Sequence, residues 1–268
     1  MTDLTAYFTR IGYDGPREPT LAVLRDLLVL HTASIPFEAI DVLQDRGVDL
    51  APEIVDAKLI DARRGGYCYE QNGLFKRVLT ALGFEVEGRI ARVRWNLPAG
   101  ELLRPPTHMV LRVKIDGVAW LCDVGFGSCV PTAPLRWDLR EPQRTGHEDF
   151  RLTDIGGDLL MEARLGEDWT PVYQVAPDVL LDQDYEINNW FSSTHPSSHF
   201  RHVLIVALTK PDARYVLAQN RLTVRRPSGE MERTMLDAEG LEHVLATTFG
   251  LPVSDDWRPL LERVAAAS

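Results

Sequence analysis

The dipeptide Asp116-Gly117 constrains the fold of this chain more than any other short stretch, because two segments of alternating apolar and polar residues flank it. Asp-Gly between such segments is a strong short-range signal for a β-hairpin with a two-residue turn. A turn of this kind places Ile115 opposite Val118. It also fixes the register of the pairs further along the two strands, and Val110 then lies opposite Asp123.

This register divides the hairpin into two faces, because successive side chains of a strand point to opposite sides. One face is entirely apolar and is the predicted core side, made of Met109, Leu111, Val113, Ile115, Val118, Trp120, Cys122 and Val124. The other face is the predicted non-core side, made of His108, Val110, Arg112, Lys114, Ala119, Leu121, Asp123 and Gly125. His108 and Asp123 are diagonal neighbours there, roughly 7–8 Å apart at the backbone, which is within reach of an imidazole and a carboxylate. Cys122 is predicted to be a buried structural thiol, and the role of Cys129, in a loop, is left open.

The stretch RRGGYCYEQN, residues 63–72, places Cys68 directly after a glycine turn. The apolar residues that follow it recur with the spacing of one helix face, at Leu74, Phe75, Val78, Leu79 and Leu82. Gly83 is a natural helix stop. The sequence therefore predicts that Cys68 lies in or near the first turn of a helix.

A cysteine at a helix start beside a His–Asp pair is typical of nucleophilic catalysis. A helix N-terminus and an imidazolium both favour the thiolate form of a thiol, and a carboxylate orients the imidazole. Taken singly, Cys68 is more often core filler, His108 a surface strand residue and Asp123 a solvated one. Their combination in the chain order Cys, His, Asp is the arrangement of papain-like scaffolds and favours a catalytic triad.

The remaining pattern predicts three blocks in 268 residues. Residues 1–84 are predicted to be a helical bundle, with one helix starting near Pro52, because proline suits a first helical turn. Residues 85–190 change to a period of two and are predicted to be strands, with further stretches near 149–154, 157–165 and 170–176. Residues 191–268 are predicted to be mixed, with strands from about 203 and helices at 237–245 and 256–267. The fold class is therefore α+β.

Composition narrows the possible functions. The net charge of −10 argues against binding nucleic acid or an anionic membrane over the whole surface. No apolar run is long enough to span a bilayer, and the N-terminus does not resemble a secretory signal, so we expect a cytoplasmic protein. Three cysteines without a CxxC pair favour neither a disulfide framework nor structural zinc. The irregular histidines of the segment 195–202 are not expected to bind a metal.

The motifs resemble those of one enzyme family. Residues 64–72 match every fixed position of the arylamine N-acetyltransferase signature, Arg-Gly-Gly-x-Cys-x-Glu-x-Asn. The resemblance extends over nearly the whole chain, through YFTRIGY at 7–13, IPFE at 35–38, Thr107-His108, DVGFG at 123–127, STHPSSHF at 193–200 and TFGL at 248–251. It implies a helical bundle, a β-barrel and an α/β lid, in that order. The absence of a long insertion before the third block is similar to the bacterial form.

The resemblance also implies roles for single residues. The family's triad corresponds to Cys68, His108 and Asp123, and its ping-pong mechanism carries acetyl from acetyl-CoA to an arylamine or arylhydrazine. Phe37 and Phe126 correspond to aromatic residues that line the acceptor pocket. The implied cofactor contacts are Thr107, Gly127 and Ser128, where Ser128 replaces a frequent glycine. We interpret Arg64 and Glu70 as support of the turn, although alone they could be surface charges.

Two other functions fit the same residues. A cysteine hydrolase or a transglutaminase-like enzyme uses the same triad, and the residues alone do not separate transfer to an amine from transfer to water. A binding module that keeps the fold without catalysis is a third possibility, against which the intact triad argues. The sequence does not indicate the natural acceptor amine, the preferred acyl chain or the oligomeric state.

Overall fold

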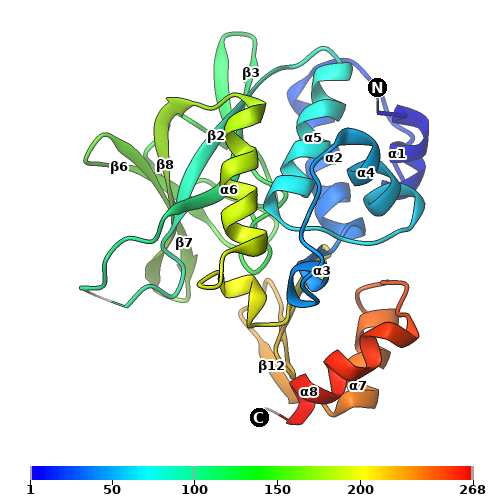
Figure 1. Ribbon diagram of the computed structural model, residues 1–268. Coiled ribbons are helices and arrows are strands. Elements are labelled where there is room, and N and C mark those ends of the chain that lie inside the picture. The colour runs from blue at the N-terminus through cyan, green and yellow to red at the C-terminus, as the bar shows by residue number, and fades with distance from the viewer. Residues whose placement is uncertain (1, 99, 267–268) are drawn as a thin grey trace.

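The first part of the chain is helical, as the sequence predicts (Figure 1). The computed structural model describes residues 2–98 and 100–266. The helices of this part are α1 (Leu4–Ile11), α2 (Leu21–Ser34), α3 (Ile40–Leu43), α4 (Pro52–Asp56), which continues as a π-helical turn over Ala57–Asp61, and α5 (Cys68–Ala81). Pro52 is at the start of α4, and Cys68 is the first residue of α5. Both helix starts are therefore confirmed.

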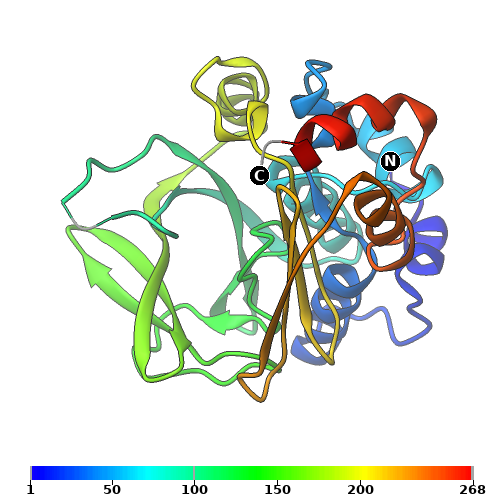
Figure 2. The ribbon, with the colours of Figure 1, turned by 90° about the horizontal axis from the view of Figure 1, so that it is seen from below.

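A seven-stranded antiparallel sheet follows and curls into a nearly closed barrel (Figure 2). Its strands are β2 (Glu85–Val93), β3 (Pro106–Ile115), β4 (Val118–Cys122), β5 (Leu135–Arg136), β6 (Phe150–Ile155), β7 (Asp158–Leu165) and β8 (Asp168–Val179). Their order in the sheet is β5-β4-β3-β2-β8-β7-β6. The predicted hairpin is confirmed, because Ile115 pairs with Val118 and Leu111 pairs with Cys122.

The predicted core face of this hairpin is buried at Met109, Leu111, Val113, Ile115, Cys122 and Val124, as expected. The prediction of a non-core face is wrong near the site, where His108, Val110, Leu121, Asp123 and Gly125 are buried too, and holds only towards the turn, where Lys114 is exposed. Leu111 and Cys122 pack in the cluster shared with the helices. Val110 and Leu121, on the supposed outer face, are fully buried in a second cluster inside the barrel. A closed barrel packs side chains within it as well as outside it, and the parity of a single hairpin does not reveal that closure.

The last part of the chain adds helices and a second sheet. It contains α6 (Asp182–Thr194), β9 (Ile205–Thr209), β10 (Arg214–Ala218), β11 (Arg221–Arg225), β12 (Met231–Met235), α7 (Ala238–Thr247) and α8 (Arg258–Ala266), with short 3₁₀ turns at His199–Arg201 and Asp255–Trp257. Residue 267 of the predicted last helix lies outside the described residues. The exact division at 84/85 and 190/191 stays a prediction.

The second sheet ties the first part of the chain to the last. Its order is β1-β9-β10-β11-β12, and β1 is the short strand Phe37–Glu38 from the helical part. Phe37 pairs with Ala207 of β9 and also bridges to Gly66, which belongs to the glycine turn before Cys68. This pairing holds the third part of the chain close to the start of α5.

Helix α6 connects the barrel to this sheet and lies across the front of the molecule (Figure 1). Its first turn is stabilised by the Asp184 carboxylate, which accepts a hydrogen bond of 2.8 Å from the Leu181 amide. Asn189 of α6 accepts a hydrogen bond from the Tyr67 hydroxyl and donates one of 2.9 Å to the Val48 carbonyl. The helix is therefore anchored to the residue that precedes Cys68.

Within residues 2–98 and 100–266, no helix is both long enough and apolar enough to cross a lipid bilayer.

Candidate active site

The glycine turn sets the position of Cys68. The Gly66 amide donates to the Pro36 carbonyl at 3.3 Å, and the Glu38 amide donates to the Gly66 carbonyl at 3.1 Å. A Cβ at Gly65 would lie 2.1 Å from the Pro36 carbonyl oxygen, so only glycine allows this approach. The turn delivers Cys68 as the first residue of α5, where backbone N–H groups are free of helical partners.

His108 and Asp123 form a buried pair, as the hairpin register predicts. The His108 Nε2 atom lies 2.7 Å from Asp123 Oδ2, and both side chains are almost inaccessible to solvent. The other carboxylate oxygen, Oδ1, accepts hydrogen bonds from Asn72 Nδ2 at 2.9 Å and from the Gly125 amide at 2.8 Å. These three contacts fix the carboxylate and, through it, the imidazole ring.

The electrostatics of the pair favour an imidazolium. Burial by itself would lower the pKa of His108, but the Asp123 carboxylate and the hydrogen bond to Cys68 raise it to about 10. Burial would raise the pKa of Asp123, but His108 and the donors from Asn72 and Gly125 lower it below its usual value. At neutral pH the pair therefore carries a charged imidazole beside a carboxylate.

Cys68 lies beside this pair. Because His108 Nε2 is hydrogen-bonded to Asp123, Nδ1 is the ring nitrogen that can bond to the sulfur of Cys68. The sulfur also lies 3.6 Å from the Thr107 carbonyl oxygen. The structure thus brings the three predicted triad residues together from α5, β3 and the end of β4.

The other two cysteines lie in different surroundings. Burial raises the pKa of the Cys122 thiol far above its usual value, and it raises the pKa of Cys129 to about 11. The prediction that Cys122 is buried is confirmed, and Cys129 is buried as well. A raised pKa keeps both thiols protonated at neutral pH, and a protonated thiol is a poor nucleophile.

Two residues of the site were not predicted. Asn72 donates to the Met109 carbonyl at 2.8 Å as well as to Asp123, and its side-chain oxygen accepts from the Val124 amide at 3.0 Å. Tyr173 of β8 packs its ring 4.9 Å from the His108 imidazole. Asn72 is the last fixed residue of the cysteine signature, and this position indicated that it belongs to the site. Tyr173 lies in an alternating strand and has no such signal.

The predicted substrate and cofactor residues lie around this centre. The Phe126 ring is 5.1 Å from the imidazole of His108. A Cβ at Gly127, which has a φ of +80°, would lie 3.0 Å from the Phe37 ring. Ser128 is half-buried, next to Gly127. The structure places these residues near the triad, and their contacts with substrates stay a prediction.

Comparison with known proteins identifies the family. The model of the N-acetyltransferase family matches residues 20–258. This chain belongs to the N-acetyltransferase family. An arylamine N-acetyltransferase of Mycolicibacterium smegmatis is 42% identical over 257 residues, which cover 94% of this chain and 93% of that protein.

Solved structures of the family have the same fold. The arylamine N-acetyltransferase structure from M. tuberculosis has a TM-score of 0.93 at 40% identity, covering 98% of this chain and 99% of that one. The Mycobacterium marinum arylamine N-acetyltransferase, solved in complex with CoA, has a TM-score of 0.93 at 41% identity, covering 98% of each chain. The predicted α+β class and the family resemblance are confirmed.

A buried charge network supports the turn of this N-acetyltransferase. Lys58 Nζ lies 2.7 Å from Asp41 Oδ2 and 2.7 Å from Glu70 Oε1. Arg64 Nη2 lies 2.8 Å from Glu38 Oε1 and 3.2 Å from Asp41 Oδ2. Arg64 and Glu70 are therefore not solvated surface charges, since their side chains are 15% and 2% exposed.

The Lys58→Met substitution should destabilise the protein by about 3 kcal/mol, because it leaves the buried Glu70 carboxylate without its cation and leaves Asp41 with Arg64 alone. Urea unfolding at pH 7 measures this loss. Lys114→Met is the matched control, since Lys114 is 43% exposed in its pair with Glu85 and such surface pairs contribute roughly 0–1 kcal/mol. Equal losses in the two variants would show that the network does not support the fold.

A neutral hydrogen-bonded chain holds the same turn from the other side. The Tyr7 hydroxyl lies 2.8 Å from His31 Nδ1, and His31 Nε2 lies 2.6 Å from Gln71 Oε1. Gln71 Nε2 then donates to the carbonyls of Pro36 at 2.8 Å and Gly66 at 3.2 Å. Tyr7, His31 and Gln71 are all fully buried. Burial lowers the pKa of His31 from 6.5 to about 4, so this histidine is neutral at pH 7.

The neutral state of His31 predicts a loss of stability in acid. The pKa of His31 is lower in the folded state, so its contribution is complete above pH 6.5 and is lost as the pH falls towards 4. Over this pH window the free energy of unfolding of the wild type should fall by roughly 3 kcal/mol through His31. The His31→Gln variant should not show this part of the fall. Urea unfolding at pH 7 and at pH 4.5 measures the difference, with the exposed His202→Gln as the control. An identical pH dependence in wild type and His31→Gln would contradict this assignment.

Within the described part of the chain, no group of three or more His, Cys, Asp and Glu side chains is placed to hold a metal ion. His195 Nδ1 instead contacts the Ser197 hydroxyl at 2.8 Å, and His202 Nε2 contacts the Pro196 carbonyl at 2.6 Å.

Proposed function

We propose that this protein transfers an acetyl group from acetyl-CoA to the nitrogen of an arylamine or arylhydrazine, by a ping-pong mechanism through acetyl-Cys68. The observation that carries the proposal is the contact of Cys68 with a buried His108–Asp123 pair whose histidine has a raised pKa. The relatives named arylamine N-acetyltransferases and the M. marinum complex with CoA support the choice of substrates.

In the first half-reaction the Cys68 sulfur, as a thiolate, attacks the thioester carbonyl carbon of acetyl-CoA. The new S–C bond forms, and the bond to the sulfur of CoA breaks. The departing CoA thiolate takes the proton of the His108 imidazolium and leaves as the thiol. The free N–H groups at the start of α5, that of Cys68 included, are suited to stabilise the oxyanion that forms during attack.

In the second half-reaction the amine nitrogen attacks the carbonyl carbon of acetyl-Cys68. The C–S bond breaks, and the electron pair returns to sulfur. Neutral His108 takes one proton from the nitrogen, which restores the imidazolium and thiolate. Asp123 keeps the ring oriented through both steps. Phe37 and Phe126 are the proposed walls for a flat acceptor, and Thr107, Gly127 and Ser128 are the proposed contacts of the thioester end of the cofactor.

Mass spectrometry tests this proposal. Incubation with acetyl-CoA alone should add one acetyl group to the protein, on Cys68, and release CoA. Addition of aniline should then remove the group and yield acetanilide. An acetyl group on Cys122 or Cys129 would overturn the assignment of the nucleophile. Turnover of a peptide or ester without CoA, with no acetyl adduct, would favour the hydrolase alternative.

A further inference from the structure

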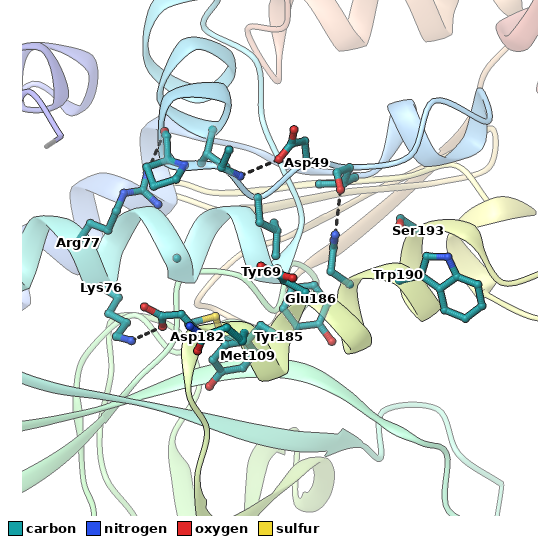
Figure 3. A pocket seen from close by; sticks show the side chains of 18 of the residues that line it. Asp49, Tyr69, Lys76, Arg77, Met109, Asp182, Tyr185, Glu186, Trp190 and Ser193 are labelled. Carbon is teal, nitrogen blue, oxygen red and sulfur yellow. Dashed lines mark hydrogen bonds and ion pairs between the residues drawn. The ribbon is translucent and has the colours of Figure 1, made fainter.

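The nucleophile helix α5 has two sides with different surroundings. One side borders a cleft between α5, α6 and the segment 46–52, where Tyr69 and Lys76 lie (Figure 3). The other side packs on strand β3 and carries Cys68 and, one turn later, Asn72. Side chains four residues apart project from the same face of a helix. Asn72 therefore faces the reactive centre together with the nucleophile.

The side-chain amide of Asn72 uses both of its N–H groups and its oxygen within the protein. Nδ2 donates to Asp123 Oδ1 at 2.9 Å and to the Met109 carbonyl at 2.8 Å. The side-chain oxygen accepts from the Val124 amide at 3.0 Å. Asn72 is fully buried. One amide thus joins α5 to β3, at the residue after His108, and to the segment that follows β4.

The backbone after β4 lies directly on the start of α5. A Cβ at Gly125 would lie 2.8 Å from Asn72 Nδ2 and 2.8 Å from the Cα atom of Cys68. Glycine at this position allows the close approach. A displacement of Asn72 would therefore move Asp123 and Cys68 relative to each other.

Asp123 needs its hydrogen-bond donors to stay charged. Burial by itself would raise the pKa of its carboxyl, whereas His108 and the donors from Asn72 and Gly125 lower it. The groups that interact electrostatically with this carboxylate come from every element packed against it, and they are His108 of β3, Cys122 of β4, Tyr173 of β8, Asn72 of α5 and the Gly125 amide. Burial raises the pKa values of Cys122 and Tyr173, so both are neutral at pH 7. The loss of Asn72 as a donor would therefore favour the protonated form of Asp123.

We propose that Asn72 is a positioning residue for acetyl transfer, whose neutral amide keeps Asp123 as the anion that orients His108 and holds the start of α5 against that pair. The role in catalysis rests on the function proposed above. A carboxylate has the same shape as this amide, but it has no N–H group and would face Asp123 with like charge. Only a proton shared between the two carboxylates would restore both the donor and the charge of the wild type.

The Asn72→Asp variant makes this role measurable through pH. Two adjacent buried carboxylates do not both ionise readily, so the pair should keep its shared proton well above the pKa of an ordinary carboxyl. Loss of that proton at higher pH leaves two carboxylates that repel each other. The kcat/KM of the variant, divided by that of the wild type at the same pH, should therefore fall at least about tenfold between pH 6 and pH 9.

Asn188→Asp is the matched control. It makes the same chemical change on α6, where the Asn188 amide donates to the Asp184 carbonyl at 3.0 Å. Its ratio to the wild type should be the same at pH 6 and pH 9. A constant ratio is also what Asn72→Asp would show if Asn72 only filled space, since a packing defect does not depend on a shared proton.

Asn72→Ala gives a second test if circular dichroism shows that Asn72→Asp is unfolded. It removes the donor without adding a charge, so the thiolate of Cys68 should be less favoured. The rate at which iodoacetamide alkylates Cys68 at pH 6, divided by the rate at pH 9, should be at least about tenfold lower than in the wild type.

The possible results separate this role from the proposed function. A pH-independent ratio for Asn72→Asp overturns the role of Asn72, and so does a wild-type ratio of alkylation rates in Asn72→Ala where Asn72→Asp is unfolded. If neither variant folds, Asn72 is a structural residue and the proposal is wrong. If the wild type forms no acetyl-Cys68, the proposed function fails, and the alkylation of Asn72→Ala still decides whether Asn72 maintains the charged state of the site.

Discussion

The Cys68→Ala variant should lose acetyl transfer by at least about 10⁴-fold and remain folded. Cys68 is the cysteine that interacts with His108 among the described residues, and the pKa values of Cys122 and Cys129 are raised by burial. Loss of the sulfur removes the atom on which the acetyl group is held between the two half-reactions. The measurement is the rate of CoA release with aniline as acceptor, together with circular dichroism to confirm the fold.

Cys129→Ala is the matched control for this result. The Cys129 thiol is fully buried in the barrel cluster and accepts a long contact of 3.9 Å from Arg225 Nη2, so its removal should leave the rate within a fewfold of wild type. If Cys68→Ala kept a tenth of the wild-type rate, or if Cys129→Ala were the inactive variant, the proposed nucleophile would be wrong.

The Asp123→Asn variant should lower kcat/KM by roughly 10³–10⁴-fold. The amide removes the charge that stabilises the imidazolium, so the pKa of His108 should fall from its raised value. With its oxygen kept where Asn72 and the Gly125 amide donate, the asparagine turns its NH2 group towards His108 Nε2, so a donor replaces the acceptor that orients the ring. The measurement is the dependence of kcat/KM on pH. The profile of the variant should lie below that of the wild type and should also differ from it in shape.

Asp116→Asn controls for the chemical change itself. Asp116 lies in the exposed hairpin turn with a φ of +49°, a conformation that asparagine also adopts. This variant should retain wild-type kinetics and pH dependence. Near-normal rates in Asp123→Asn would remove Asp123 from the catalytic group and leave it a structural role only.

The hairpin shows what the sequence could predict. A two-residue turn between alternating strands leaves one register, and that register placed His108 diagonal to Asp123 before any coordinates. The helix start at Cys68 followed from two glycines and the spacing of apolar residues. Both inferences rest on local backbone chemistry, which does not depend on the rest of the fold.

Non-local features were missed or wrong. The burial of the His108 face depends on barrel closure by β6 to β8, which no local pattern reports. Helix α6 was not predicted, because Leu181, Ile187 and Trp190 are exposed and blur its amphipathic pattern. Strand β12 has no buried residue to mark it, and the two-residue strand β1 is too short to show a period.

The site outside the triad depends on contacts between distant segments. Tyr173 reaches His108 because β8 pairs with β2, whose other neighbour is β3. The proposed roles of Phe37 and Phe126 came from the family resemblance. Their positions beside Gly127 and His108 support those proposed roles.

We propose that Cys68 reacts as an anion because His108, oriented by Asp123, holds the proton. The most direct test is the rate at which iodoacetamide alkylates Cys68 at pH 6 compared with pH 9 in the same protein, since the ratio cancels limited access to a buried site. The proposed ion pair predicts rates within a fewfold of each other. A rate at pH 6 lower by about two orders of magnitude, as an ordinary thiol with a pKa near 8.5 would show, would contradict it.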